Sequence, residues 1–130
     1  FSANPLTMVA GLAAMEQLTH QHYERLDNLG HRLRTRSNAV FRDAGESAQI
    51  TGDGSVFRVV MTADPIIDYR SSVLGATASS RMSTLHHNLL ERGVIIHKEG
   101  LGCLSTPMSN VEIDRFVTAL HQSVALLPSS

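Results

Sequence analysis

Several residue types are scarce in this chain, and their scarcity narrows what it can do. Among 130 residues there is one cysteine, Cys103, and no tryptophan, and aromatic residues make up 5%. A single thiol excludes an internal disulfide and fits a reducing compartment, so we expect a cytoplasmic protein with a buried, structural Cys103. Ten of the eleven Lys and Arg residues are arginines. Chemistry that needs a lysine amine therefore has one candidate here, Lys98.

The chain also lacks an excess of either charge and lacks a long apolar run. Its 11 basic and 12 acidic residues are interspersed and give a formal net charge of −1, so neither nucleic acid nor a membrane surface is an expected partner. No apolar run approaches the roughly 18–20 residues that a membrane span needs. With 42% hydrophobic residues, the chain has the length and composition of one domain with a core.

Helical spacing predicts two helices in the first third of the chain. Asn4 can cap the first, which is expected over residues 5–18. Because that segment is rich in Ala and Met and carries little charge, we expect much of it to be buried. The second begins after Thr19 and ends at Gly45, and Gly30 on its apolar stripe indicates close backbone contact with a neighbour. Its arginines are expected on a solvated face: Arg25, Arg32, Arg34, Arg36 and Arg42.

The rest of the chain alternates short strand patterns with two further helices. Strands are expected at residues 48–51, 55–62, 94–97 and 103–106, and the second, apolar on both faces except at Arg58, should be central. Helices are expected at residues 78–92 and after the capping box of Ser109 and Glu112. Since neighbouring strands usually pair, the predicted fold is α+β, a small, mainly antiparallel sheet with helices packed on it, in the order α-α-β-β-α-β-β-α.

The first residues form a candidate anion site. Ser2 and Ala3 leave open backbone just before the helix that Asn4 caps, and a helix N-terminus is a usual place to hold a phosphate. The sequence does not begin with Met. We therefore expect a piece of a longer protein, cut close to this site.

A polar loop, His97-Lys98-Glu99-Gly100, separates two apolar segments and is the second candidate site. Three ionisable residues there fit either an exposed hairpin tip or the mouth of a site that another part of a protein completes. A Schiff-base role for Lys98 would require a depressed pKa, and the neighbouring Glu99 acts in the opposite direction.

Other catalytic patterns are poorly matched. Neither the spacing of His20 and His22 nor that of His86 and His87 places two ligands on one side of a helix. There is no G-x-S-x-G nucleophile elbow. We therefore expect no metal ligand in this chain, and a metal hydrolase built on the histidine pairs is the weakest alternative. No two acidic residues stand out as a pair for hydrolysis, although that chemistry stays open.

Four stretches, in order along nearly the whole chain, resemble class III aminotransferases, which are fold-type I pyridoxal-phosphate enzymes. The branch that they resemble contains glutamate-1-semialdehyde aminomutase and the β-amino-acid aminotransferases. The stretches are Phe1-Ser2-Ala3-Asn4-Pro5-Leu6, which resembles T-x-S-G-N-P-L; Tyr23-Glu24-Arg25-Leu26 with Leu29-Gly30 and Leu33; Gly54-Ser55-Val56-Phe57, which resembles G-S-M/L-F; and Leu89-Leu90-Glu91-Arg92-Gly93-Val94, followed by Leu104-Ser105-Thr106 and Glu112-Ile113-Asp114-Arg115.

The resemblance implies the C-terminal part of an enzyme that moves an amino group between an amino or keto acid and pyridoxal phosphate, as a homodimer. It implies that residues 1–18 are an interface helix and phosphate-side segment, in which Ser2, Ala3 and Asn4 bind the cofactor. Residues 19–130 would be the small C-terminal domain, with His97, Lys98 and Glu99 on the substrate side.

The resemblance also implies what this sequence lacks. The cofactor lysine would lie upstream, so the fragment alone should be inactive. Ala3 replaces a glycine of the family pattern. Glu99 stands where some β-amino-acid enzymes place a carboxylate-binding arginine, and an acid cannot pair with a substrate carboxylate at neutral pH. The alternative is a stand-alone α+β binding or dimerisation module without catalysis.

Overall fold

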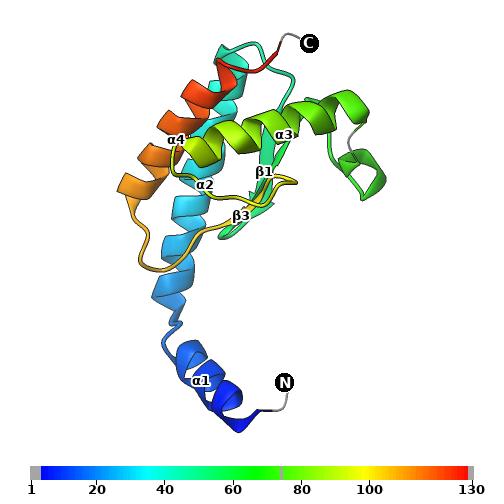
Figure 1. The fold of residues 1–130 in the computed structure, drawn as a ribbon. Helices are drawn as coiled ribbons and strands as arrows, with labels where there is room; N and C mark the ends of the chain where they lie inside the picture. Colours follow the sequence, from blue (N-terminus) through cyan, green and yellow to red (C-terminus); the bar gives the residue numbers. More distant parts are fainter. Residues whose placement is uncertain (1–3, 74, 129–130) are drawn as a thin grey trace.

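The computed structural model describes residues 4–73 and 75–128. Its elements confirm the α+β prediction and follow one another along the chain as Figure 1 shows. They are α1 (Pro5–Glu16), α2 (His20–Asp43), β1 (Gln49–Asp53), β2 (Val56–Val60), the 3-10 helix η1 (Arg70–Ser72), α3 (Ala76–Glu91), β3 (Leu101–Cys103) and α4 (Asn110–Val124).

The three strands form one antiparallel sheet in the order β1-β2-β3. The prediction that the second strand is central is therefore confirmed. Register places Ile50, Val59 and Phe57 on one face, where all three are buried. The alternate residues, among them Val56 and Arg58, point to the opposite face.

The prediction of a strand at residues 94–97 was wrong. These residues form no strand, because the chain turns tightly after His97. The hydrogen bond from the His97 N–H to Leu101 O, at 2.7 Å, closes this turn. The last strand also begins earlier than expected, at Leu101 rather than at Cys103. Its neighbours fix that position, since Val59 N donates to Gly100 O and Leu104 N donates to Ser55 O.

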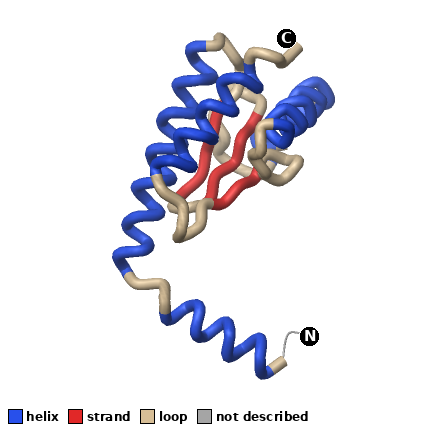
Figure 2. The backbone as a smooth tube through the Cα atoms, turned by 60° about the vertical axis from the view of Figure 1, so that its left-hand side comes forward, coloured by secondary structure: helices blue, strands red, loops and turns tan. Residues whose placement is uncertain are grey.

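Helices cover the sheet unequally. Figure 2 shows α2 and α4 together on one side of the sheet and α3 on the other. The core lies mainly under α2 and α4, where the rings of Phe57 and Phe116 meet edge to face with centroids 5.4 Å apart. α3 buries Met82, Leu85 and Leu89, and the side-chain amide of Asn88 donates a hydrogen bond to Ser123 O of α4.

Close packing of α2 on the sheet requires Gly30, as predicted. A Cβ added at Gly30 would lie 1.9 Å from the carbonyl oxygen of Gly54. The arginines of α2 do more than face solvent, which corrects that expectation. Arg25 donates to Thr106 O at 2.7 Å, and both Arg32 and Arg36 pair with Asp114 of α4. These bonds fasten α2 to the segment that leads into α4 and to α4 itself.

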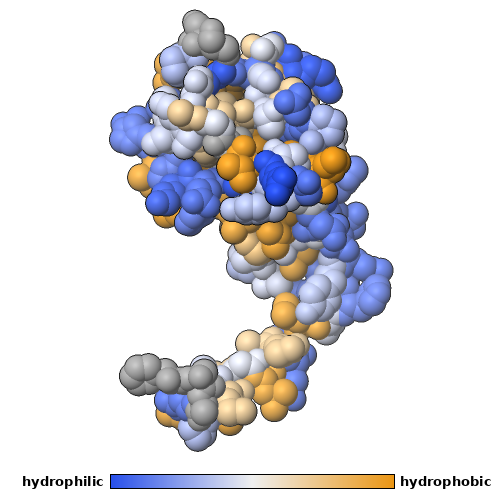
Figure 3. Space-filling view, turned by 90° about the vertical axis from the view of Figure 1, so that its right-hand side faces the viewer, coloured by the Kyte–Doolittle hydropathy of each residue, from blue (hydrophilic) through white to orange (hydrophobic). Residues whose placement is uncertain are grey.

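The helix α1 contradicts its predicted burial. None of its residues is buried, and Leu6 and Met15 are 79% and 71% exposed. Figures 1 and 3 show α1 extending away from the sheet and the other helices, with apolar residues on its surface. Within the described residues, no helix is both long enough and apolar enough to cross a membrane.

Candidate functional site

The N-terminal candidate site is described only in part. Asn4 caps α1, since its side-chain oxygen accepts the Leu6 N–H at 2.9 Å, and Pro5 occupies the first helical position. Ser2 and Ala3, the other two residues predicted to bind the cofactor, lie outside the described residues. A phosphate site at this helix start therefore stays a prediction.

The loop of His97, Lys98 and Glu99 is held tightly on the central strand. Its three side chains are exposed, but Gly100 behind them is buried and has φ = 85°. A Cβ at Gly100 would lie 2.2 Å from Val59 O. The carbonyl oxygen of Gly100 also accepts a hydrogen bond from the Val59 N–H. Only glycine allows this approach. The loop is thus an exposed tip with a fixed backbone.

Lys98 and Glu99 line a cavity of about 310 Å³. His97 does not line it, and its ring Nδ1 instead accepts the Glu99 N–H at 3.3 Å. Arg58, from the face of β2 that α2 and α4 leave open, enters the same cavity, and its Nε donates to Glu99 O at 3.3 Å. The remaining wall comes from η1 and α3, with Tyr69, Ser72, Val73, Ser79 and Met82.

The wall at η1 was missed by sequence reasoning, which left residues 63–76 unassigned. Asp68 and Ser71 fix this turn, since Ser71 N donates to Asp68 Oδ1 at 2.8 Å and Ser71 Oγ accepts the Asp68 N–H at 3.0 Å. The hydrogen bond from the Ser71 N–H, followed by those from the Ser71 hydroxyl and the Arg70 N–H, lowers the pKa of the Asp68 carboxyl group. An Asp followed three residues later by Ser is a turn signal that could have located the wall.

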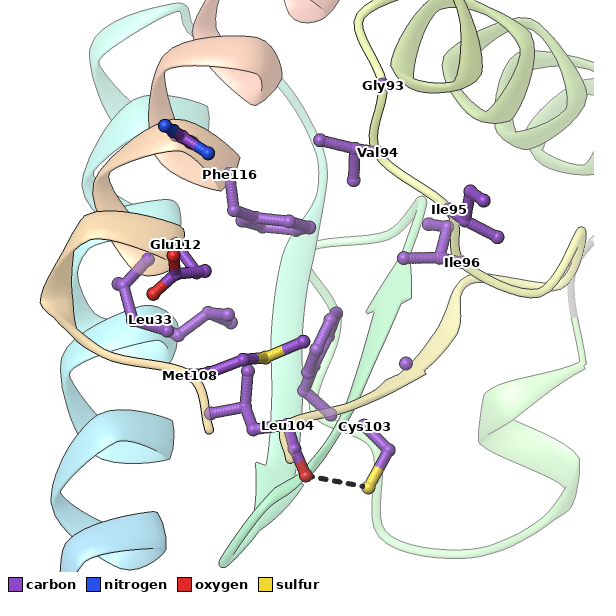
Figure 4. A pocket seen from close by; sticks show the side chains of 14 residues that line it. Leu33, Gly93, Val94, Ile95, Ile96, Cys103, Leu104, Met108, Glu112 and Phe116 are labelled. Carbon is purple, nitrogen blue, oxygen red and sulfur yellow. Dashed lines mark hydrogen bonds between the residues drawn. The ribbon is translucent and has the colours of Figure 1, made fainter. Parts of the chain in front are cut away.

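A second cavity, of about 250 Å³, lies between α4 and the segment from Gly93 to Leu104. Figure 4 shows Val94, Ile96, Met108 and Phe116 around it, all apolar. Glu112 at its edge belongs to the α4 capping box, in which Glu112 Oε2 accepts the Ser109 N–H at 2.7 Å. No sequence pattern predicted this cavity.

Cys103 borders the second cavity and is exposed, contrary to the prediction of a buried thiol. It pairs with Val56 on the face of the sheet opposite Phe57 and Val59, so the alternation of β3 turns its side chain away from the core under α2 and α4. Its Sγ lies 3.3 Å from Leu104 O (Figure 4).

The histidines form no metal cluster within the described part of the chain, where no three His, Cys, Asp or Glu side chains gather. His20 and His87 instead lie 3.4 Å from Glu24 and Glu91, each one helical turn further along. Both pairs are exposed and belong to solvated helix surfaces.

Known proteins are similar to this chain in sequence and in fold. Glutamate-1-semialdehyde 2,1-aminomutase of Opitutus terrae is 32% identical over 95% of the chain, and β-phenylalanine transaminase of Variovorax paradoxus is 33% identical over 98%. A crystal structure of an omega-transaminase from Sphaerobacter thermophilus matches 95% of the chain with a TM-score of 0.90 and 43% identity. The chain belongs to the pyridoxal-phosphate-dependent class III aminotransferases.

The chain covers only a part of the length of those relatives. It spans 29% of the aminomutase, 30% of the β-phenylalanine transaminase and 28% of the omega-transaminase. A further structure, a transaminase with pyridoxal phosphate bound, matches 95% of this chain with a TM-score of 0.79, and the match covers 27% of that transaminase. No protein-family model matches the sequence.

Proposed function

We propose that this chain is the C-terminal part of a pyridoxal-phosphate-dependent aminotransferase or aminomutase that moves an amino group on an amino or keto acid. The observation that carries the proposal is the fit to the Sphaerobacter omega-transaminase, at a TM-score of 0.90 with 43% identity. Relatives of both reaction types, aminomutase and transaminase, support the broader class.

The two parts of the chain have different roles in this proposal. Residues 1–18 serve as an interface helix and phosphate-side segment, and residues 19–130 serve as the small C-terminal domain. Support comes from α1. This helix carries apolar residues on every side, yet all of its large apolar side chains are exposed. Such a helix is normally buried. We assign its cover to the rest of the enzyme, assembled as a homodimer.

Pyridoxal phosphate supplies the electron sink for this chemistry when bound. The described residues fit the edge of its site. The exposed N-terminus of α1 suits a phosphate, which Ser2, Ala3 and Asn4 would hold. Lys98 does not fit as the lysine that carries the cofactor, because it stands exposed on a loop and such a lysine needs a desolvated pocket. No catalytic residue is assigned to this chain.

The loop residues act on the substrate side. Glu99 can accept a hydrogen bond from a substrate amine or hydroxyl group, and Lys98 can balance its charge. His97 shapes the loop, because its ring accepts the Glu99 N–H and its backbone closes the turn on Leu101. The Gly100 contact with β2 holds the backbone of this loop in place.

The proposed enzyme works in the cytoplasm, which the single exposed thiol supports. Its active site would be completed by parts of the enzyme outside this chain. The 130-residue chain by itself should carry no transaminase activity.

The test compares the 130-residue chain with the protein encoded by the complete reading frame, both supplied with pyridoxal phosphate. We expect amino transfer by the complete protein alone, with borohydride reduction and peptide mass spectrometry locating the cofactor on a lysine outside residues 1–130. A reduced adduct on Lys98 would overturn the division of the site. A complete protein that neither transfers nor rearranges an amino group on any α- or β-amino acid would overturn the function.

A further inference from the structure

Two cavities join beside α4 and form one groove. The apolar cavity of about 250 Å³ shares Gly93, Val94 and Arg115 with a third, more polar cavity of about 570 Å³. This third cavity lies between the end of α3 and the outer side of α4, where Thr118 and Gln122 line it. The groove therefore has an apolar inner end and a polar outer end.

The outer end of the groove is open to solvent. On α4, Arg115, Thr118 and Gln122 are exposed, and so is Gly93 on the opposite wall. At the inner end, by contrast, Phe116 is 7% exposed and belongs to the core. A ligand can enter from the side of α4, and the part of it that reaches the inner end would leave water.

The positive charges of the groove have donors to spare. Arg115, which lies where the two cavities join, donates no hydrogen bond to any described residue. Arg92, at the end of α3, uses Nη1 to donate to Asn88 O at 2.8 Å, and its other side-chain nitrogens donate to no described residue. Two guanidinium groups thus face one cavity with most of their hydrogen-bonding capacity unused.

The negative charges of the groove are already engaged. Glu112 Oε2 accepts the Ser109 N–H at 2.7 Å in the capping box, and the bonds from Ser109 are the main cause of the lowered pKa of Glu112. Asp114 pairs with Arg32 and Arg36 of α2. Because both carboxylates have partners elsewhere, the unused charge in the groove is positive and favours an anion.

The inner end has room for a short apolar chain. Figure 4 shows Val94, Ile96, Met108 and Phe116 around it. An apolar cavity of about 150 Å³ holds a benzene molecule, and such a cavity offers water few hydrogen-bond partners. A volume of about 250 Å³ therefore suits an apolar tail somewhat longer than benzene, of the size of the octanoate chain.

We propose that this groove binds an amphiphilic carboxylic acid, with its carboxylate at Arg92 and Arg115 and its apolar tail in the inner cavity. The planar guanidinium group suits two carboxylate oxygens at once. The inference does not depend on the proposed aminotransferase function. Among the described residues, the groove shares no lining residue with the cavity of Lys98 and Glu99.

The test measures binding of octanoate to the complete protein by calorimetry. Arg115→Gln should raise Kd about fivefold to tenfold, because a charge-assisted contact is lost at an exposed site. Arg42→Gln, at an exposed arginine at the end of α2, is the matched control and should leave Kd unchanged. The thermal midpoint shows whether each variant is folded.

Two further ligands separate the head from the tail. Octan-1-ol keeps the tail without the charge, so its Kd should be the same for the unchanged protein and for Arg115→Gln. Butanoate keeps the charge and lacks four methylene groups. Since each buried methylene group is worth about a fourfold gain in affinity, butanoate should bind at least about a hundredfold more weakly than octanoate.

Methyl NMR locates the tail without any arginine variant. Met108 lines the inner cavity, whereas Met61 is buried in the core and is not among the described residues of that wall. In protein with ¹³C-labelled methionine methyl groups, octanoate should shift the Met108 signal and leave the Met61 signal in place. Met108→Leu and Met61→Leu assign the two signals. This measurement decides the location of the tail even if Arg115→Gln does not fold.

Three results would overturn the proposal. They are no binding of octanoate to the complete protein, the same Kd in folded Arg115→Gln, and a Met108 signal that octanoate does not move. None of them bears on the aminotransferase function, which the amino-transfer assay tests separately.

Discussion

The helix α1 and the body formed by α2 to α4 with the sheet both contain leucines, and these leucines lie in opposite environments. In α2, Leu33 is 1% exposed, while in α1 Leu12 is 60% exposed. The stripe of α2 is matched by the sheet and by α4, and its opposite side carries arginines and other polar groups. The apolar residues of α1 surround the helix, so no single face could satisfy them. Periodicity thus locates packing within the chain, whereas uniform apolarity points to a surface outside it.

The largest contrast is expected from truncating one leucine in each region. Leu33→Ala removes a fully buried side chain and should lower the free energy of unfolding by about 2–5 kcal/mol. Leu12→Ala should change it by less than about 0.5 kcal/mol in the 130-residue chain, because the side chain is already in water. Urea titration followed by circular dichroism measures both. Similar losses would show that α1 packs on the body.

Two helical glycines sharpen the comparison. Gly30→Ala drives a methyl group into the Gly54 carbonyl, 1.9 Å away, and should cost about 1–3 kcal/mol. Gly11→Ala meets nothing within 4 Å. It should therefore strengthen α1 by about 0.5–1 kcal/mol of helix propensity without altering the urea midpoint of the body. A stable Gly30→Ala variant would contradict the observed contact between α2 and the turn.

Helix caps provide a smaller effect. Ser109→Ala breaks the capping box of α4 and should cost about 1 kcal/mol in urea unfolding. Asn4→Ala removes the equivalent cap from α1. It should lower helicity measured at 222 nm in the folded baseline, with no shift of the midpoint, since α1 is not coupled to the body. A midpoint shift as large as that of Ser109→Ala would contradict this separation.

The smallest expected effect is a change in how stability depends on pH, and it arises from two carboxyl groups of α4. Hydrogen bonds from Arg36 and Arg32 lower the pKa of Asp114 from its ordinary 3.8, and bonds from Ser109 lower the pKa of Glu112 from 4.5. A lowered pKa in the folded state means stabilisation that is complete above the ordinary value and lost as pH falls through the folded one. Stability should therefore decline below about pH 4.5, and Asp114→Asn should flatten that decline in urea midpoints. Identical acid limbs would exclude the Asp114 contribution.

Local signals predicted the features that depend on a few neighbouring residues. Ser109 and Glu112 predicted the start of α4, and Gly30 predicted a close backbone contact of α2 without identifying the partner, which is Gly54. The errors concern partners that are distant in sequence. An apolar run such as residues 94–97 looks the same whether or not a strand lies beside it. The exposure of Cys103 follows from the register of β3 on β2, which alternation alone leaves undetermined.

The candidate site likewise has features that the sequence predicted and features that depend on residues distant in sequence. The polar loop at residues 97–99 could be identified from its charge between apolar segments, and the structure places two of its three residues on one cavity. Arg58 appeared in the sequence only as the exception in an apolar strand. The hydrogen bond from Arg58 to Glu99 O joins residues far apart in the chain. The cavity wall at η1 depends on a turn closed by Asp68 and Ser71.

Amide hydrogen exchange in α1 tests the central claim most directly, that this helix is covered by the remainder of a class III aminotransferase. Exchange over Pro5–Glu16 would be measured in the 130-residue chain and in the complete protein. We predict rapid exchange in the chain and strong protection in the complete protein, while α2 and α4 are protected in both. Equally rapid exchange of α1 in both proteins would contradict the account.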